Sequence, residues 1–146
     1  MAESPTVLSP EERDQFLVEP HIGALSVDSG EEGRAPLTVP IWYQYEPGGD
    51  LWVTTSADSR KARLLTRAGR FSLMVDRSEP TWRYVSVEGP IVATEPCTPE
   101  LLREMAARYL PPERVDGYVE FSREKFGEAL VFRMRPQRWL SADLGK

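Results

Sequence analysis

Short apolar stretches separated by turn residues make up most of this chain. Six segments have the length and the apolar or alternating pattern of β-strands: 21–27, 36–45, 51–55, 70–76, 82–94 and 129–136. Such patterns are typical of strands with at least one buried face. Glycines and acids in 28–34 and 46–50 predict turns between the first three strands. The dipeptide Gly89-Pro90 predicts a bulge or bend within the fifth strand.

Helix signals occupy the gaps in this strand pattern. A helix is predicted to begin at Ser9-Pro10, an N-cap followed by proline, and to end before Pro20. Further helices are expected at about 57–67, from Thr98 to Pro111, and from Pro112 to Lys125. Six strands with helices at the edges predict a mainly β barrel with peripheral helices.

Length and composition favour one domain. The chain has 146 residues, of which 40% are hydrophobic. This is enough for one core. We therefore expect a single domain over 1–146, with 1–8 as a mobile arm. The chain has no run of the roughly 18 to 20 apolar residues that a membrane span requires, so no membrane association is expected.

Charge is unevenly distributed along the chain, whose formal net charge is −5. Residues 1–50 hold ten acids and two cations, whereas residues 51–146 hold thirteen acids and sixteen cations. Non-specific nucleic-acid binding needs a broad basic face, so we expect no nucleic-acid partner. A local basic pocket for one small anion remains compatible with this balance.

One cysteine, Cys97, and one histidine, His21, limit the chemistry that is available. They exclude an internal disulfide and make a zinc site or a Cys–His nucleophile pair an unfavourable interpretation. The N-terminal segment, MAESPTVLSPEERDQF, is acidic and lacks the apolar region of a secretory signal, so we expect a cytoplasmic protein. No catalytic residue is identifiable, because no triad or acid–base pair is present.

The segment 54–65 carries the strongest chemical signal. Five cations and no acid lie between residues 60 and 70, directly after a predicted strand that ends in Thr54-Thr55. Hydroxyls, a helix N-terminus and the adjacent Arg60 and Lys61 together predict a phosphate-binding site. A solvated basic helix is the alternative interpretation of the same cations.

The order of five motifs resembles the pyridoxamine 5′-phosphate oxidase-like split-barrel flavoproteins. These motifs are V-P-I-W-Y at 39–43, L-W-V-T-T at 51–55, S-R-K-A at 59–62, F-S-L-M-V at 71–75 and Y-V-S-V-E-G at 84–89. The resemblance implies a six-stranded split β-barrel that forms a homodimer with two cofactors at the subunit interface. It also implies a small-molecule substrate and an FMN cofactor.

The resemblance assigns roles to individual positions. Residues expected to bind the FMN phosphate and ribityl chain are Thr54, Thr55, Ser59, Arg60 and Lys61. The strand whose backbone is expected to run along the flavin ring contains Val39, Pro40, Ile41 and Trp42. Tyr84 matches a position from which the second subunit reaches the cofactor. Packing in the core or at the dimer interface is the alternative interpretation for Trp42 and Tyr84.

The function implied is an oxidoreductase that transfers hydride to or from a small organic substrate. The deazaflavin F420 is an alternative cofactor, and Arg63 and Arg67 are candidates for binding its anionic tail. The segment 138–143 does not reproduce the substrate-phosphate cluster of true pyridoxamine-phosphate oxidases, which argues against vitamin B6 oxidation. A non-catalytic carrier of flavin or haem is the other alternative, with His21, Cys97, a methionine or a tyrosine as the haem ligand.

Overall fold

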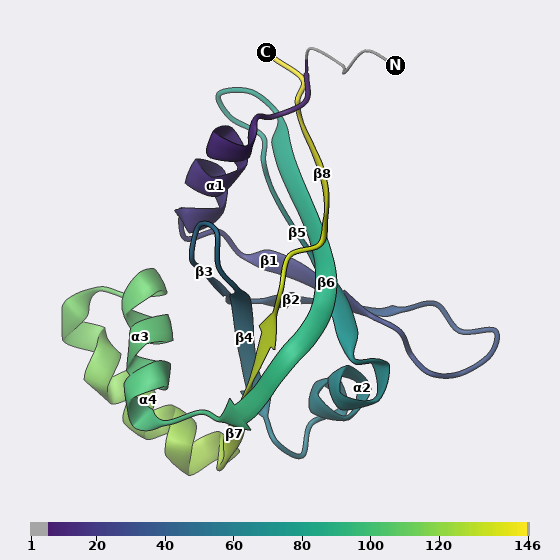
Figure 1. Cartoon of the computed structure of the whole chain (residues 1–146). Helices are drawn as coiled ribbons and strands as arrows, with labels where there is room; N and C mark the ends of the chain where they lie inside the picture. Colours follow the sequence, from purple (N-terminus) through teal and green to yellow (C-terminus); the bar gives the residue numbers. More distant parts are fainter. Residues whose placement is uncertain (1–5, 146) are drawn as a thin grey trace.

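The computed structural model describes residues 6–145 and has one curled antiparallel sheet with four helices around it (Figure 1). The strands are β1 (Gly23–Val27), β2 (Leu37–Ile41), β3 (Gln44–Tyr45), β4 (Leu51–Ser56), β5 (Arg70–Arg77), β6 (Arg83–Pro96), β7 (Ala129–Met134) and β8 (Arg138–Asp143). Their order is β2-β1-β5-β6-β7-β4-β3, and β8 pairs with β6. The strand β2 therefore lies at one end of this order.

The long strand β6 joins the two halves of the curled sheet. Its first part pairs with β5 and β8, and its last part pairs with β7. The register shifts between Ile91 and Ala93, which confirms the irregularity predicted after Gly89-Pro90. Gly89 itself is buried against the backbone carbonyl of Arg135, with no room for a side chain. This close approach lets one strand bend and serve both halves of the sheet.

The helices are α1 (Pro10–Val18), α2 (Arg60–Ala68), α3 (Pro99–Tyr109) and α4 (Pro112–Phe126). Ser9 and Glu12 form a capping box at the start of α1, as the sequence around Ser9-Pro10 indicates. The helix α2 begins three residues later than expected, and Ser59 caps it. Gly69 ends α2 in the left-handed conformation, which glycine adopts without strain.

Apolar side chains form one large core and two smaller clusters. The large core lies within the curled sheet and includes Phe16, Leu25, Leu73, Val87 and Phe132. The hairpin of α3 and α4 has its own cluster: Leu102, Ala106, Val115 and Val119. A third cluster of Trp52, Met105 and Val131 connects this hairpin to the sheet. The hairpin is therefore a separate layer beside β4 and β7 (Figure 1).

The structure confirms a mainly β split-barrel fold with peripheral helices and adds two strands to the six expected. The segment predicted as one strand, 36–45, divides into β2 and β3 at Trp42-Tyr43, and the expected C-terminal tail forms β8. In the predicted mobile arm, residues 1–5 lie outside the described residues. Leu8 is buried, and the Asp143 amide donates to the Thr6 carbonyl, which fixes the end of that arm.

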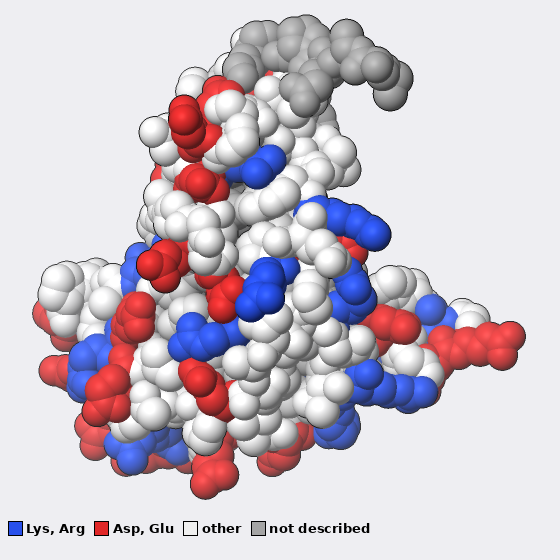
Figure 2. All heavy atoms as spheres, viewed as in Figure 1, with Lys and Arg blue, Asp and Glu red and all other residues white. Residues whose placement is uncertain are grey.

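Three features of the described residues bear on membranes, nucleic acids and metal ions. No helix within residues 6–145 is long and apolar enough to cross a membrane. Lys and Arg alternate with Asp and Glu on the face shown in Figure 2, where no continuous basic patch is present. Over the same described residues, no group of three or more His, Cys, Asp or Glu side chains has the spacing of a metal site.

Candidate functional site

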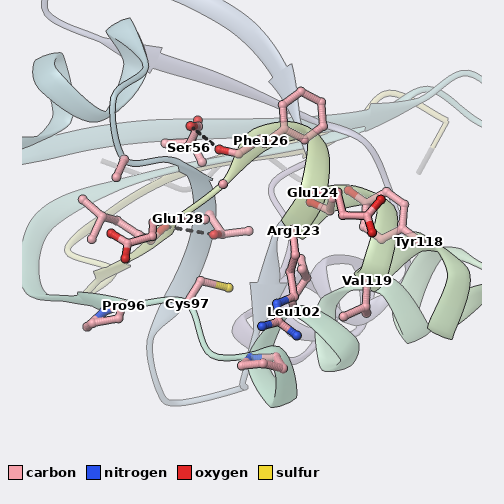
Figure 3. Close-up of a pocket in the computed structure, with 18 of the residues that line it drawn as sticks. Ser56, Pro96, Cys97, Leu102, Tyr118, Val119, Arg123, Glu124, Phe126 and Glu128 are labelled. Atoms are coloured by element: carbon pink, nitrogen blue, oxygen red, sulfur yellow. Dashed lines mark hydrogen bonds between the residues drawn. The ribbon is translucent and has the colours of Figure 1, made fainter.

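A cavity of about 1380 Å³ lies between the C-terminal end of β4 and the α3–α4 hairpin (Figure 3). Residues 54–57 form one side with Ser59 and Lys61 of the α2 start, and the end of β6 contributes Pro96 and Cys97. The opposite side consists of α3 and α4 residues such as Leu102, Tyr118 and Phe126. The cavity is larger than a typical small-ligand pocket, which has roughly 300–1,000 Å³.

Three hydrogen bonds hold the two sides of the cavity together. The Ser56 hydroxyl donates to the Phe126 carbonyl at 3.1 Å, as Figure 3 shows. The Ala57 amide donates to the Glu128 carbonyl at 2.9 Å, and the Cys97 amide donates to the Ala129 carbonyl at 2.8 Å. The C-terminal end of the hairpin is therefore fixed to the β4–α2 connection, and the Cys97–Ala129 bond joins the segments on either side of the hairpin.

Hydroxyl groups and a helix N-terminus make up the β4 end of the cavity. The oxygens of Thr55 Oγ1 and Ser59 Oγ lie 3.2 Å apart, and Ser59 Oγ accepts from the Ala62 amide at 3.1 Å. The Thr54 hydroxyl donates to the Leu130 carbonyl at 2.9 Å. The first turn of α2 contains no acid, so its unpaired amides and dipole favour an anion.

The two predicted phosphate-binding cations differ in position. Lys61 is half-buried and lines the cavity, whereas Arg60 is exposed and does not line it. Neither side chain has an ion pair with an acid among residues 6–145. Lys61 therefore presents an uncompensated positive charge at the hydroxyl end, and Arg60 lies beside it on the helix surface.

The cations considered for an F420 tail lie elsewhere. Arg63 donates to the Asp58 carbonyl at 3.0 Å, and Arg67 lines a second, smaller cavity with Asp28 and Glu31. Neither Arg63 nor Arg67 lines the large cavity. The structure thus does not bring these two arginines to the predicted phosphate site.

None of the residues of the predicted flavin-ring strand lines the cavity. Val39 and Ile41 point toward the large core, whereas Pro40 is exposed on the other face of β2. Trp42 follows β2 and stacks on Tyr109 of α3, with ring centroids 4.7 Å apart and an interplanar angle of 10°. Its centroid is also 5.3 Å from that of Tyr118, which lines the cavity. Trp42 is therefore the member of this strand segment nearest to the cavity wall.

Tyr84 lies on the outward face of the sheet, away from the lining of the cavity. Its cross-strand neighbours are Asp76 and Ala142. The adjacent row on that face runs in register through Pro40, Ala24, Met74, Ser86 and Leu140. Leu140 is 64% exposed and Met74 37% exposed. This row therefore presents apolar surface to the outside.

Two ionisable groups of the cavity remain protonated at neutral pH. Burial raises the pKa of the Cys97 thiol, and the neighbouring Thr54 hydroxyl only partly offsets this effect. Burial also raises the pKa of the Tyr118 phenol, with the Ser122 hydroxyl acting in the opposite direction. Both groups are neutral hydrogen-bonding partners rather than anions.

Comparison with known protein families decides the classification. The family model for pyridoxamine 5′-phosphate oxidase matches residues 9–142. The chain belongs to the pyridoxamine 5′-phosphate oxidase family. This membership agrees with the resemblance expected from the five sequence motifs. No curated protein sequence is significantly similar to this chain.

Solved structures show the same family fold. A conserved hypothetical protein from Mycobacterium tuberculosis is 26% identical, with a TM-score of 0.71, over 98% of this chain and 89% of that chain. An F420 reductase is 19% identical, with a TM-score of 0.66, over 87% of this chain and 94% of that chain. A FAD-binding protein from Mesorhizobium loti is 21% identical, with a TM-score of 0.61, over 94% of each chain.

Within this family member, sequence reasoning identified one side of the cavity and missed the other. Thr54, Thr55, Ser59 and Lys61, which the family resemblance assigns to cofactor binding, all line it. The opposite wall, including Tyr118 and Phe126, was expected only as a helix of unassigned role. Its one sequence signal is the aromatic spacing on α4, which is equally typical of packing against a core.

Proposed function

We propose that this protein is an oxidoreductase that binds FMN and transfers hydride to or from a small organic substrate. The observation that carries the proposal is the β4 end of the large cavity. There the uncompensated Lys61, the hydroxyls of Thr55 and Ser59, and the N-terminus of α2 face a space large enough for a mononucleotide. This donor set fits a phosphate dianion.

The residues of the chain have distinct roles in this proposal. Thr55, Ser59 and the first-turn amides of α2 orient the phosphate, while Lys61 neutralises its charge. Arg60 adds a second cation when its exposed side chain turns toward the bound phosphate. When bound, the flavin ring supplies the hydride chemistry. The edge strand β2 supplies backbone groups beside the ring, and Pro40 lacks an amide that would need a partner there.

The charges of the cavity favour FMN over F420. The acids that line it are Asp116, Glu120, Glu124 and Glu128, and the cations are Lys61, Arg103 and Arg123. Arg103 already donates to Asp116 at 3.0 Å. An anionic lactyl-glutamate tail would therefore meet more acids than free cations. F420 remains the second candidate, because an F420 reductase shares the fold and Arg123 has no ion pair within the described chain.

We also propose that the protein is a homodimer formed through the outward face of the sheet. The exposed and mostly apolar row of Pro40, Ala24, Met74, Ser86 and Leu140 supports this, since a contiguous apolar surface is typical of an interaction site. Tyr84 lies on the same face, two residues from Ser86. A second copy covering this face would place Tyr84 at the subunit interface. Light scattering of wild-type protein and Leu140→Glu tests this, with a monomeric variant expected.

A carrier of flavin or haem without catalysis is the alternative. Cys97 and Tyr118 are potential haem ligands in the cavity, but burial raises the pKa of both groups and disfavours the anionic forms that bind iron. His21 packs on Phe16 with ring centroids 4.4 Å apart, and it does not line the cavity.

One cysteine without a disulfide partner supports the proposed cytoplasmic location.

The visible spectrum of the purified protein, followed by titration with FMN and F420, tests the proposed function. Bands of oxidised flavin, or uptake of FMN at micromolar concentration, are expected. Protein that is colourless and binds neither cofactor contradicts the proposal, and a strong Soret band would identify a haem carrier. Steady-state turnover with reduced cofactor then separates an enzyme from a carrier.

A further inference from the structure

The cavity extends well beyond the phosphate-binding end. Its wall on the α3–α4 hairpin presents Leu102, Tyr118 and Val119 (Figure 3). These side chains offer aromatic and aliphatic surface, whereas the β4 end offers hydroxyls and a cation. The two ends are therefore suited to different chemical groups.

The Tyr118 ring is held by a stack of aromatic rings. Trp42 lies between Tyr118 and Tyr109, at centroid distances of 5.3 Å and 4.7 Å. The Tyr109 hydroxyl accepts from the Tyr43 amide at 3.1 Å and donates to the His21 carbonyl at 2.8 Å. Because α3 is anchored in this way, the wall offers a rigid aromatic surface to a ligand.

The charges at this end of the cavity are mostly negative. Glu120 and Glu124 lie on one face of α4, four residues apart, and neither has an ion pair within the described chain. Asp116 is already paired with Arg103, which leaves Arg123 as the cation on this side without an ion pair among the described residues. An anionic group placed against this wall would be repelled, whereas a neutral or cationic group would not.

We propose that the α3–α4 end of the cavity is the substrate subsite, and that it takes the planar conjugated ring of an uncharged or cationic compound against Tyr118. This inference rests on the proposed function, in which the phosphate of the cofactor occupies the β4 end. It assigns Tyr118 as a substrate-contacting residue. Trp42 and Tyr109 act as positioning residues that fix the orientation of Tyr118.

Direct binding of three naphthalene probes tests the subsite without turnover. The probes are 2-naphthol, 2-naphthylmethylammonium and 2-naphthoate, which share one ring system and differ in charge. Calorimetric titration of the full-length wild-type protein should give measurable binding of the neutral and cationic probes and at least about threefold weaker binding of the anion. Binding of none of the probes, or tightest binding of 2-naphthoate, would overturn the proposal.

Variants on α4 locate the ring. Tyr118→Leu keeps an apolar side chain but removes the aromatic face, and it should weaken binding of 2-naphthol by about tenfold. Phe121→Leu is the matched control, because Phe121 is 54% exposed on the same helix and does not line the cavity. Tyr118→Phe should bind nearly as well as wild type. Equal affinity of wild type and Tyr118→Leu would place the ring elsewhere and overturn the inference.

A charge variant and a phosphate-site variant complete the experiment. Glu120→Gln combined with Glu124→Gln should tighten 2-naphthoate and weaken the ammonium probe, each by about threefold, since these acids are exposed to solvent. Lys61→Ala should leave 2-naphthol binding unchanged and weaken FMN. If no FMN binds to wild type while 2-naphthol still depends on Tyr118, the cofactor proposal fails and the aromatic subsite stands.

Discussion

Two charged regions of this protein are built in opposite ways. Asp143 on β8 is buried, and it accepts hydrogen bonds from the Thr81 hydroxyl at 2.9 Å, Arg83 Nε at 2.8 Å and the Gly145 amide at 2.9 Å. At the start of α2, by contrast, Lys61 faces a cavity with no acidic partner in the described residues. The comparison separates charges that hold the fold from charges that are available to a ligand.

The physical reason is the hydration that each charged group loses when it has no hydrogen-bonding partner. A buried carboxylate is costly unless several donors compensate its lost hydration, so the Asp143 network must be complete. A half-exposed ammonium keeps part of its hydration and tolerates the absence of a partner. A site with spare charge beside a cavity is therefore a better indicator of binding than a completed network.

Removal of both cations at the start of α2 should have the largest effect. Arg60→Ala combined with Lys61→Ala should weaken FMN binding by about 100-fold or more, because two charge-assisted contacts to the phosphate are lost. The urea midpoint should stay within error of wild type, since neither side chain has an ion pair within the described chain. Arg63→Ala is the control, being on the same helix and outside the cavity. An unchanged FMN dissociation constant would show that the phosphate binds elsewhere.

The Asp143 network should respond to pH as a structural site. Burial alone would raise the pKa of Asp143, but the hydrogen bonds from Gly145, Thr81 and Arg83 outweigh it and lower the pKa from 3.8 to about 2. The ionised carboxylate thus stabilises the fold above about pH 4, and this contribution is lost as the pH falls toward about 2.

Urea midpoints measured from neutral to strongly acidic pH test this dependence. Asp143→Asn should lower the midpoint at neutral pH and reduce its fall in acid, while the affinity for FMN at neutral pH should not change. A variant as stable as wild type at neutral pH would mean that the network does not hold β8 to β6. A large loss of FMN affinity would show that the Asp143 network also supports ligand binding, which contradicts the division between the two regions.

Ser59 contributes both to the fold and to the proposed ligand site, because it caps α2 and lines the cavity. Ser59→Ala should lower the free energy of unfolding by about 1 kcal/mol through loss of the cap. It should also weaken FMN binding several-fold, since a phosphate donor disappears. Ser9→Ala, which removes the cap of α1, is the matched control and should reduce stability alone. Denaturant unfolding and FMN titration of both variants provide the measurement.

Tyr109→Phe should have the smallest effect. It removes the hydroxyl that accepts from the Tyr43 amide and keeps the ring that stacks on Trp42. The free energy of unfolding should therefore fall by about 1 kcal/mol or less. Tryptophan fluorescence should change slightly as Trp42 becomes less ordered, and the FMN affinity should be nearly that of wild type. A collapse of the fold would show that the hairpin is anchored mainly through this hydroxyl.

The sequence alone determined the parts of this protein that depend on near neighbours. Strand periodicity, the cap at Ser9, and the run of hydroxyls and cations from Thr54 to Lys61 are local signals, so a mainly β barrel with peripheral helices and a candidate phosphate-binding segment were predictable, while the split barrel followed from the family resemblance. The helix α2 was expected to begin near residue 57, whereas in the structure it begins at Arg60 after the Ser59 cap.

The tertiary structure decided everything that depends on residues far apart in the chain. Tyr118 of α4 contacts Trp42, which follows β2. Asp143 at the end of β8 contacts Arg83 at the start of β6. Neither partner carries a sequence signal of the other, because the α3–α4 hairpin is placed by packing against the sheet and β8 by pairing with β6. The chain therefore encodes its phosphate-binding end in one short segment, whereas the opposite wall exists only after the hairpin has folded against β4 and β7.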